Sequence, residues 1–218
     1  MRILGLDTSG KVASAAVLDT ERDLLLASRT LYTERGHSQV ILPMVQDMLA
    51  GCGLAAADID CYAVSVGPGS YTGLRIGIAA VQGMAMVRET PCIGVSTLAA
   101  AAAMLTGDVP VLGIMHARAE LFYAALFRGD RVTEDALLTL PALTELLAPY
   151  DRVLLVGDGA QELMRQYTGG TTLETVPTAL RLPTAAGVCT AAAKMTPGAP
   201  QDLTASYLQA VNITKKGG

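Results

Sequence analysis

The stretch S-V-G-P-G-S-Y-T-G-L-R-I-G at residues 65–77 decides the fold, because it passes from a strand through a tight turn into a helix. The apolar run at 61–66 is typical of a buried strand. The segment G-P-G-S-Y-T-G at 67–73 supplies the glycines and the proline of a tight turn. Apolar residues then recur at helical spacing from 72 to 87. This order predicts an α/β fold.

The turn at 67–73 has two interpretations that the residues alone leave equally open. Backbone N–H groups at the start of a helix, together with the helix dipole, suit an anion such as phosphate. The segment is neither a Walker A loop nor G-x-G-x-x-G, since its spacing differs and no Lys is followed by Ser or Thr. Gly67 and Gly69 are equally expected in a turn that needs only backbone freedom.

A second polar turn, formed by Asp7, Thr8, Ser9 and Gly10, follows an apolar strand at 2–7. Hydroxyl and N–H groups in such a turn can bind phosphate, and a carboxylate beside them can bind the water of a Mg²⁺ ion. The same four residues are also typical of an ordinary hairpin turn. On these residues alone the hairpin turn is favoured.

Two helices in the first half of the chain carry most of the apolar pattern. The apolar positions of the first helix are three or four residues apart: Ile41, Met44, Val45, Met48 and Leu49. The second helix, 72–87, is apolar nearly all round, which predicts burial on two sides. Gly73 and Gly77 would let another helix approach it closely. We expect the two helices to pack together and to leave an apolar patch of the kind that marks an interface.

The order of elements predicts two lobes. Each half of the chain opens with strands joined by turns and continues with alternating helices and strands. The segment Thr-Gly-Asp at 106–108 breaks the pattern, so the predicted lobes are 1–105 and 106–218. The segment at 204–213 suits a strand or a helix equally.

Composition and charge narrow the classes of function. The chain of 218 residues is 51% hydrophobic with a net charge of -4, so we expect a folded protein without the basic face of a nucleic-acid binder. Lys215 and Lys216 form only a short basic tail. We find no apolar run of the roughly 18 residues that a membrane span needs, and no signal-peptide pattern. The expected location is the cytoplasm.

The sequence offers no metal site and no catalytic group of residues. His37 and His116 are its 2 histidines, and its 4 cysteines form no C-x-x-C pair. Neither histidine has a nucleophile or carboxylate partner in the sequence. The segment G-D-G-A at 157–160 is a weak nucleotide signal that a strand-to-helix turn explains equally well. We therefore predict no catalytic and no metal-binding residue.

The block at 65–77 resembles the TsaB family, accessory subunits of the bacterial machinery that makes threonylcarbamoyladenosine on tRNA. The segments I-L-G-L-D-T-S-G at 3–10 and G-H-S-Q-V-I-L-P at 36–43 share that resemblance, in the family's order and spacing. The resemblance implies the two-lobed, ribonuclease H-like fold of the actin, sugar-kinase and Hsp70 superfamily. Each lobe would be a mixed five-stranded sheet with helices.

The resemblance also implies a function without catalysis of its own. The family member would be needed to modify the adenosine next to the tRNA anticodon, by docking to TsaD, the catalytic paralogue that transfers threonylcarbamoyl. A small ATPase, TsaE, would join the assembly, and tRNA would be bound only indirectly. We expect no cofactor of the chain's own, with ATP or ADP restricted to the interface of the complex. Alone, the chain would form a homodimer, and one shared apolar surface would make the homodimer and the complex exclusive.

The docking surface implied by the resemblance lies on the two first-lobe helices. Its expected residues are His37, Ile41, Met44, Val45, Met48, Gly73, Leu74, Gly77, Ile78 and Val81.

The chain departs from the family pattern at three positions. Family members often have D-A-R where this chain has His116 and the residues after it, Glu where it has Leu121, and Arg where it has Gln209. Loss of a carboxylate at 116 removes a candidate Mg²⁺ contact. The two polar turns are therefore expected at most to be the remnant of a phosphate site, with residues Asp7, Thr8, Ser9, Gly10, Gly67 and Gly69.

Two alternative functions remain at this point. An ATP-dependent small-molecule kinase of the same superfamily would use Asp7, and it predicts a second acidic turn in the second lobe, where His116 stands. A peptidase, ranked third, needs metal ligands or a catalytic base that the sequence does not offer.

Overall fold

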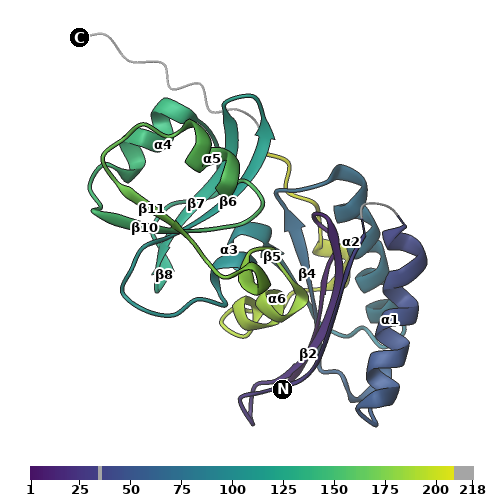
Figure 1. Cartoon of the computed structure of the whole chain (residues 1–218). Coiled ribbons are helices and arrows are strands. Elements are labelled where there is room, and N and C mark those ends of the chain that lie inside the picture. Colours follow the sequence, from purple (N-terminus) through teal and green to yellow (C-terminus); the bar gives the residue numbers. More distant parts are fainter. Residues whose placement is uncertain (34–35, 209–218) are drawn as a thin grey trace.

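The computed structural model describes residues 1–33 and 36–208, and it shows two lobes, each built around one sheet (Figure 1). The first sheet has five strands in the order β3-β2-β1-β4-β5. Its strands are β1 (Arg2–Asp7), β2 (Val12–Asp19), β3 (Leu24–Tyr32), β4 (Cys61–Gly67) and β5 (Cys92–Ser96). Neighbours β1, β2 and β3 are antiparallel, whereas β4 and β5 run parallel to β1. The mixed five-stranded sheet expected for the first lobe is confirmed.

Helices α1 (His37–Gly51) and α2 (Tyr71–Met86) lie side by side on one face of this sheet (Figure 1). Their apolar stripes pack against β1, β2 and β4 in one core. The Ser70 hydroxyl caps α2 by accepting the Gly73 N–H at 3.2 Å. Both predicted helices are confirmed to within a residue or two at each end. A short 3₁₀ turn, η1 (Ala56–Asp58), follows α1.

The opposite face of the first sheet is covered by α3 (Thr97–Ala102) and α6 (Ala185–Ala192). Helix α3 contacts strands of both sheets, so it lies between the lobes. Helix α6 packs on β1 and β2, although the sequence placed it in the lobe 106–218. The chain thus returns to the first lobe after crossing the second, because the apolar underside of the first sheet needs this cover.

The second sheet has six strands, one more than expected. Its strands are β6 (Val111–Arg118), β7 (Leu121–Arg128), β8 (Asp130–Arg131), β9 (Ala136–Thr139), β10 (Arg152–Val156) and β11 (Thr172–Thr175). The extra strand arises because β8 and β9 pair with different parts of one edge of β7. Helices α4 (Leu140–Leu147) and α5 (Ala160–Gln166) cover one face of this sheet, and η2 (Thr178–Leu180) leads back toward α6.

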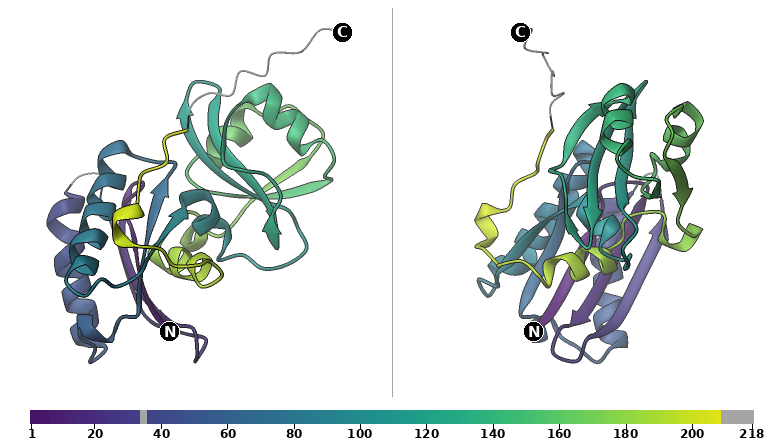
Figure 2. Two further views of the ribbon diagram at one scale, coloured as in Figure 1. Left: turned by 180° about the vertical axis from the view of Figure 1, so that it is seen from behind. Right: turned by 90° about the vertical axis from the view of Figure 1, so that its left-hand side faces the viewer.

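After α6, the chain runs back across the first lobe (Figure 2, yellow). It passes through η3 (Pro200–Asp202) and then lies beside α2 without helix or strand from 204 to 208. The strand or helix expected at 204–213 is therefore absent from its described part, and 209–213 lies outside the described residues. Within 1–33 and 36–208, no helix is long and apolar enough to cross a membrane.

We expect the contact between β1 and α6 to be intolerant of any side chain at Gly5. An added Cβ would lie 2.6 Å from Cys189 Sγ and 2.9 Å from the Ala185 carbonyl oxygen. Gly5→Ala should therefore lower the free energy of unfolding by about 1–3 kcal/mol, as overpacking in cores does. Urea unfolding followed by circular dichroism measures this change. Gly51→Ala, in helix α1, is the control, because nothing lies within 4 Å of its added Cβ.

Candidate functional site: the joined turns and the α1–α2 groove

The carboxylate of Asp7 lies at the centre of a buried hydrogen-bond network. Its side chain is 0% exposed. Ser9 donates to its Oδ1 twice, from the backbone N–H at 3.1 Å and from the hydroxyl at 3.0 Å. The Ser65 hydroxyl donates to Oδ2. Both carboxylate oxygens are therefore hydrogen-bonded within the chain.

Further hydrogen bonds join the turn at 7–10 to the turn at 67–73. The Ser70 N–H donates to the Ser9 carbonyl oxygen at 2.7 Å. The Thr8 hydroxyl donates to the Gly73 carbonyl oxygen at 2.7 Å. An added Cβ at Gly73 would collide with the Thr8 carbonyl oxygen, so this close approach requires glycine. We call the two segments the joined turns; together they fix the start of α2 against the end of β1.

Burial raises the pKa of Asp7 above its ordinary value, while hydrogen bonds from Ser65 and Ser9 act in the opposite direction. Asp7, Thr8 and Gly67 are buried within the joined turns and do not line the cleft between the lobes. Of the expected phosphate remnant, only Ser9, Gly10 and Gly69 line the cleft between the lobes. The sequence could not show this, because the covering turn comes from a distant part of the chain.

The cleft between the lobes has a volume of about 490 Å³. It is lined by Ser9, Gly10, Lys11, Gly69, Ser70, Met115, His116, Ala117, Tyr123 and Asp158. Enclosure by the cleft walls raises the pKa of Asp158, and the positive charge of Lys11 across the cleft opposes that shift. Sequence reasoning missed Lys11, although it directly follows the D-T-S-G turn.

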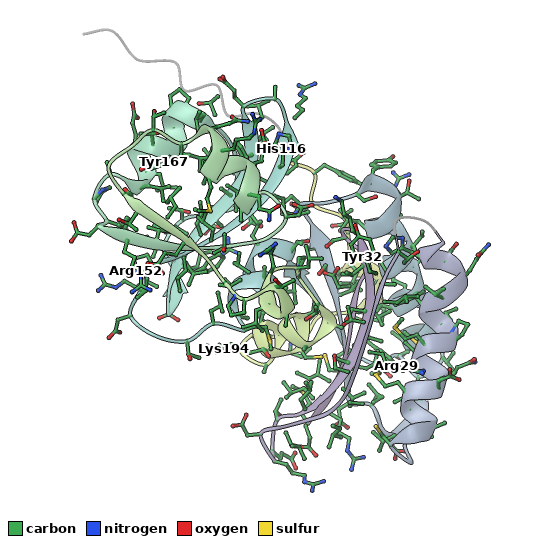
Figure 3. The ribbon with its side chains drawn as sticks, in the orientation of Figure 1. Arg29, Tyr32, His116, Arg152, Tyr167 and Lys194 are labelled. Carbon is green, nitrogen blue, oxygen red and sulfur yellow. The ribbon has the colours of Figure 1, made fainter. Side chains whose placement is uncertain are left out.

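His116 lies near the boundary between the lobes (Figure 3). Its Nε2 is 2.9 Å from the Ala119 carbonyl oxygen, and its ring lies 5.3 Å from that of Phe122. The His116 ring thus contacts a backbone carbonyl and an apolar ring, and the His116 backbone bonds to Asp158. Within 1–33 and 36–208, no group of three His, Cys, Asp or Glu side chains could bind a metal ion. Leu121 begins β7 and is half-buried, and Gln209 lies outside the described residues.

The residues expected on the docking surface all lie inside the first lobe. The buried set comprises His37, Ile41, Met44, Val45, Met48, Gly73, Leu74, Gly77, Ile78 and Val81. An added Cβ at Gly77 would meet the Thr8 hydroxyl and Val64, so this glycine serves the joined turns and not a second helix. Most of these side chains therefore face the sheet, while Val45 also lines the other side of the two helices. That this set contacts a partner stays a prediction.

The opposite face carries an apolar groove of about 510 Å³ between the two helices, which we call the α1–α2 groove. It is lined by Leu42, Val45, Gln46, Leu49, Ala56, Tyr62, Ala79, Ala80, Gly83, Met84, Val87 and Arg88. Leu42 is 44% exposed and Val87 82%, and Met86 beside them is 71% exposed. Arg88 is the only charged side chain of this lining, and it donates to the Ala57 carbonyl oxygen at 2.6 Å. An exposed apolar surface of this kind is typical of a protein interface.

We expect Asp7 to destabilise the fold increasingly as the pH rises. Because its folded-state pKa lies above 3.8, its contribution to stability is fully present below that pH and is lost as the pH rises through the folded-state pKa. Asp7→Asn removes this titration while keeping an acceptor for Ser9 and a donor for Ser65. The difference in unfolding free energy between wild type and Asp7→Asn should therefore fall with increasing pH.

Urea titrations between pH 4 and pH 8 test this expectation. A difference that does not change with pH would contradict a raised pKa. Asp7→Ala is the control for the hydrogen bonds themselves: it does not titrate either, but it leaves the Ser9 and Ser65 donors unpaired, so it should be about 1–3 kcal/mol less stable than Asp7→Asn at every pH.

Comparison with known proteins agrees with this architecture. The family model described as "TsaD: tRNA N6-adenosine threonylcarbamoyltransferase" matches residues 31–216. The tRNA threonylcarbamoyladenosine biosynthesis protein TsaB of Escherichia coli is 41% identical over 133 residues, which cover 60% of this chain and 56% of that protein. The aligned stretch thus spans just over half of the E. coli relative. The TsaB protein of Bacillus subtilis is 32% identical over 161 residues, which cover 71% of this chain and 69% of that protein.

Among solved structures, YeaZ from Pseudomonas aeruginosa superimposes with a TM-score of 0.79 at 28% identity, covering 95% of this chain and 99% of that one. The expected two-lobed α/β fold is confirmed. The I-L-G-L-D-T-S-G, G-H-S-Q-V-I-L-P and 65–77 segments all lie in the first lobe that these relatives share. The chain therefore belongs to the TsaB family.

Proposed function

We propose that this chain is an accessory subunit needed for threonylcarbamoyladenosine modification of tRNA. We propose further that it acts by docking its α1–α2 groove to the catalytic paralogue that transfers threonylcarbamoyl, a TsaD-type protein. The observation that carries the proposal is the exposed apolar groove on a member of the TsaB family. The curated relatives are named for the biosynthesis of this nucleoside, and the matching family model is that of the transferase itself.

The groove suits a stable protein partner better than a small polar substrate. Its most exposed apolar side chains are Leu42 and Val87. Interface cores are depleted of charge and enriched in Met and large apolar side chains. Alone, the chain would cover the same groove with a second copy, so homodimer and mixed complex would compete for it.

The proposal assigns the chemistry to the partner. Support comes from Asp7, whose oxygens are both bonded to serines within the chain, and from His116, which bonds to a backbone carbonyl. The net charge of -4 supports contact with tRNA through the partner only. A TsaE-type ATPase would join this assembly in the cytoplasm, with ATP or ADP at the interface of the complex and no cofactor held by this chain alone.

The kinase alternative finds less support. It needs the Asp7 carboxylate free to bind Mg²⁺-bound water beside a nucleotide, and Asp7 is buried beneath the joined turns. The peptidase alternative needs a catalytic base or a metal, whereas the His116 ring bonds to the Ala119 carbonyl oxygen and to no nucleophilic side chain described here. The accessory function therefore stands as the single proposal.

A charge placed in the groove should abolish docking without unfolding the chain. Leu42→Glu and Val87→Glu each add a carboxylate to an exposed position that the interface would remove from water. We expect each substitution to weaken binding of the TsaD-type paralogue at least tenfold, or about 1.4 kcal/mol. Isothermal titration calorimetry measures this change, and thermal unfolding confirms that the fold survives.

Met164→Glu, on α5 of the second lobe, is the matched control, because Met164 and Leu42 are both 44% exposed and both helical. It should bind like wild type. Equal binding by Leu42→Glu and wild type would place the docking surface elsewhere. If the wild-type chain does not bind the paralogue, the proposed function itself is wrong.

Light scattering during gel filtration should show a homodimer of the chain alone and a mixed complex once the paralogue is added. Leu42→Glu should form neither the homodimer nor the mixed complex.

A further inference from the structure

The segment 198–207, which we call the C-terminal strap, is fastened to the first lobe at several levels (Figure 2, yellow). At its start, Gly198 exchanges two backbone hydrogen bonds with Cys92, at 2.9 and 2.8 Å. In its middle, the Leu203 side chain is buried in the first-lobe core. Near its end, the Ser206 N–H donates to the Val66 carbonyl oxygen at 2.7 Å.

The strap is also bonded to α2, through side chains of that helix. Gln82 Nε2 donates to the Pro200 carbonyl oxygen at 3.0 Å and to the Leu203 carbonyl oxygen at 3.3 Å. Arg75 Nε lies 3.2 Å from the Tyr207 hydroxyl oxygen, to which it donates. Arg75 and Gln82 are about two helical turns apart, so they lie on one face of α2. That face is the flank of α2 that meets the strap.

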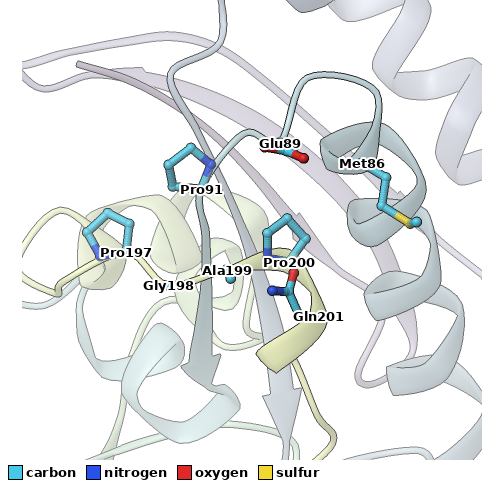
Figure 4. Close-up of a pocket in the computed structure, with 8 residues that line it drawn as sticks. All are labelled: Met86, Glu89, Pro91, Pro197, Gly198, Ala199, Pro200 and Gln201. Carbon is cyan, nitrogen blue, oxygen red and sulfur yellow. The ribbon is translucent and has the colours of Figure 1, made fainter.

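Gln82 bonds to the strap at a level where packing leaves a gap. A crevice of about 620 Å³ separates the strap from the end of α2 (Figure 4). Met86 and Pro91 line its first-lobe side, and Pro197, Pro200 and Gln201 line its strap side. Side chains do not fill this crevice. At this level, therefore, the Gln82 hydrogen bonds rather than packing connect α2 to the strap.

The same helix carries one wall of the α1–α2 groove. Gly83 follows Gln82 directly and lines the groove, as does Ala79 one turn before it. Helix α2 therefore has α1 on one flank and the strap on the other. A shift of α2 away from the strap would change the width of the groove on its other side.

We infer that Gln82 is a positioning residue, which holds α2 against the C-terminal strap in the place that docking of the partner needs. The inference rests on the proposed function, because it concerns the same groove. Without the Gln82 amide, the carbonyl groups of Pro200 and Leu203 lose their hydrogen-bond donor. We expect this loss to raise the equilibrium constant for local detachment of the strap about tenfold. The strap would then detach more often, and each detachment would leave α2 without its support.

Two substitutions of similar length separate the hydrogen bonds from the shape of the side chain. Gln82→Met keeps the length but cannot donate, so we expect about three- to tenfold weaker binding of the TsaD-type paralogue by calorimetry. Gln82→Lys keeps a donor for both carbonyls, so it should bind within about twofold of wild type. Hydrogen exchange of the Gly198 and Ser206 amides should be about tenfold faster in Gln82→Met than in Gln82→Lys.

Leu163→Ala is the control for stability, since Leu163 is buried in the core of the second lobe, whereas α2 packs in the core of the first lobe. It should lower the thermal midpoint and leave affinity unchanged. Equal affinity of Gln82→Met and wild type would overturn the inference, and so would equal losses in Gln82→Met and Gln82→Lys. Failure of the wild-type chain to bind would instead refute the proposed function, and the exchange rates would still decide whether Gln82 holds the strap.

Discussion

The hydrogen bonds of the joined turns determine where α2 begins, and the position of α2 determines most of the surface that this chain offers. Asp7 accepts from Ser9 and from Ser65, which places the end of β1 beside the end of β4. Thr8 then bonds to the carbonyl of Gly73 in the first turn of α2. A buried carboxylate is costly unless its oxygens are satisfied, so this network is either complete or strongly destabilising. The close contact also explains why the first turn of α2 has a glycine, Gly73, where it meets Thr8.

The same network affects how the polar turn at residues 7–10, at the end of β1, is interpreted. In an open cleft, an Asp beside hydroxyls and N–H groups suits phosphate and a hydrated metal ion. Here those groups bond to a second turn of the same chain, and the residues left in the cleft are Ser9, Gly10, Lys11 and the side chains opposite them. The side chains of Asp7 and Thr8 therefore serve the internal structure, because their hydrogen bonds join separate parts of the first lobe. A likeness of fold does not by itself assign a ligand to such a turn.

Local pattern was enough to predict the helices, the first sheet and the two-lobed fold, since periodicity and turn residues report local structure directly. It also identified a helical stripe that includes Ile41 and Met44, and these side chains pack on the first sheet, so the docking contact expected of the stripe stays a prediction. Gly77 was misread because its neighbour, Thr8, is distant in sequence and close only in the fold. The return of α6 to the first sheet and the division of one β7 edge between β8 and β9 are likewise tertiary features.

An exposed apolar groove is unfavourable for a protein that works alone, since Leu42 and Val87 are left in contact with water. This unfavourable contact disappears when another protein covers them, and it disappears equally whether the cover is a second copy or a catalytic partner. If both use one groove, the stability of the homodimer is subtracted from the free energy of forming the mixed complex. The chain then stays covered while its partner is scarce and is released by mass action as the partner accumulates. A single apolar surface can in this way protect the subunit and regulate its assembly, without a second binding site.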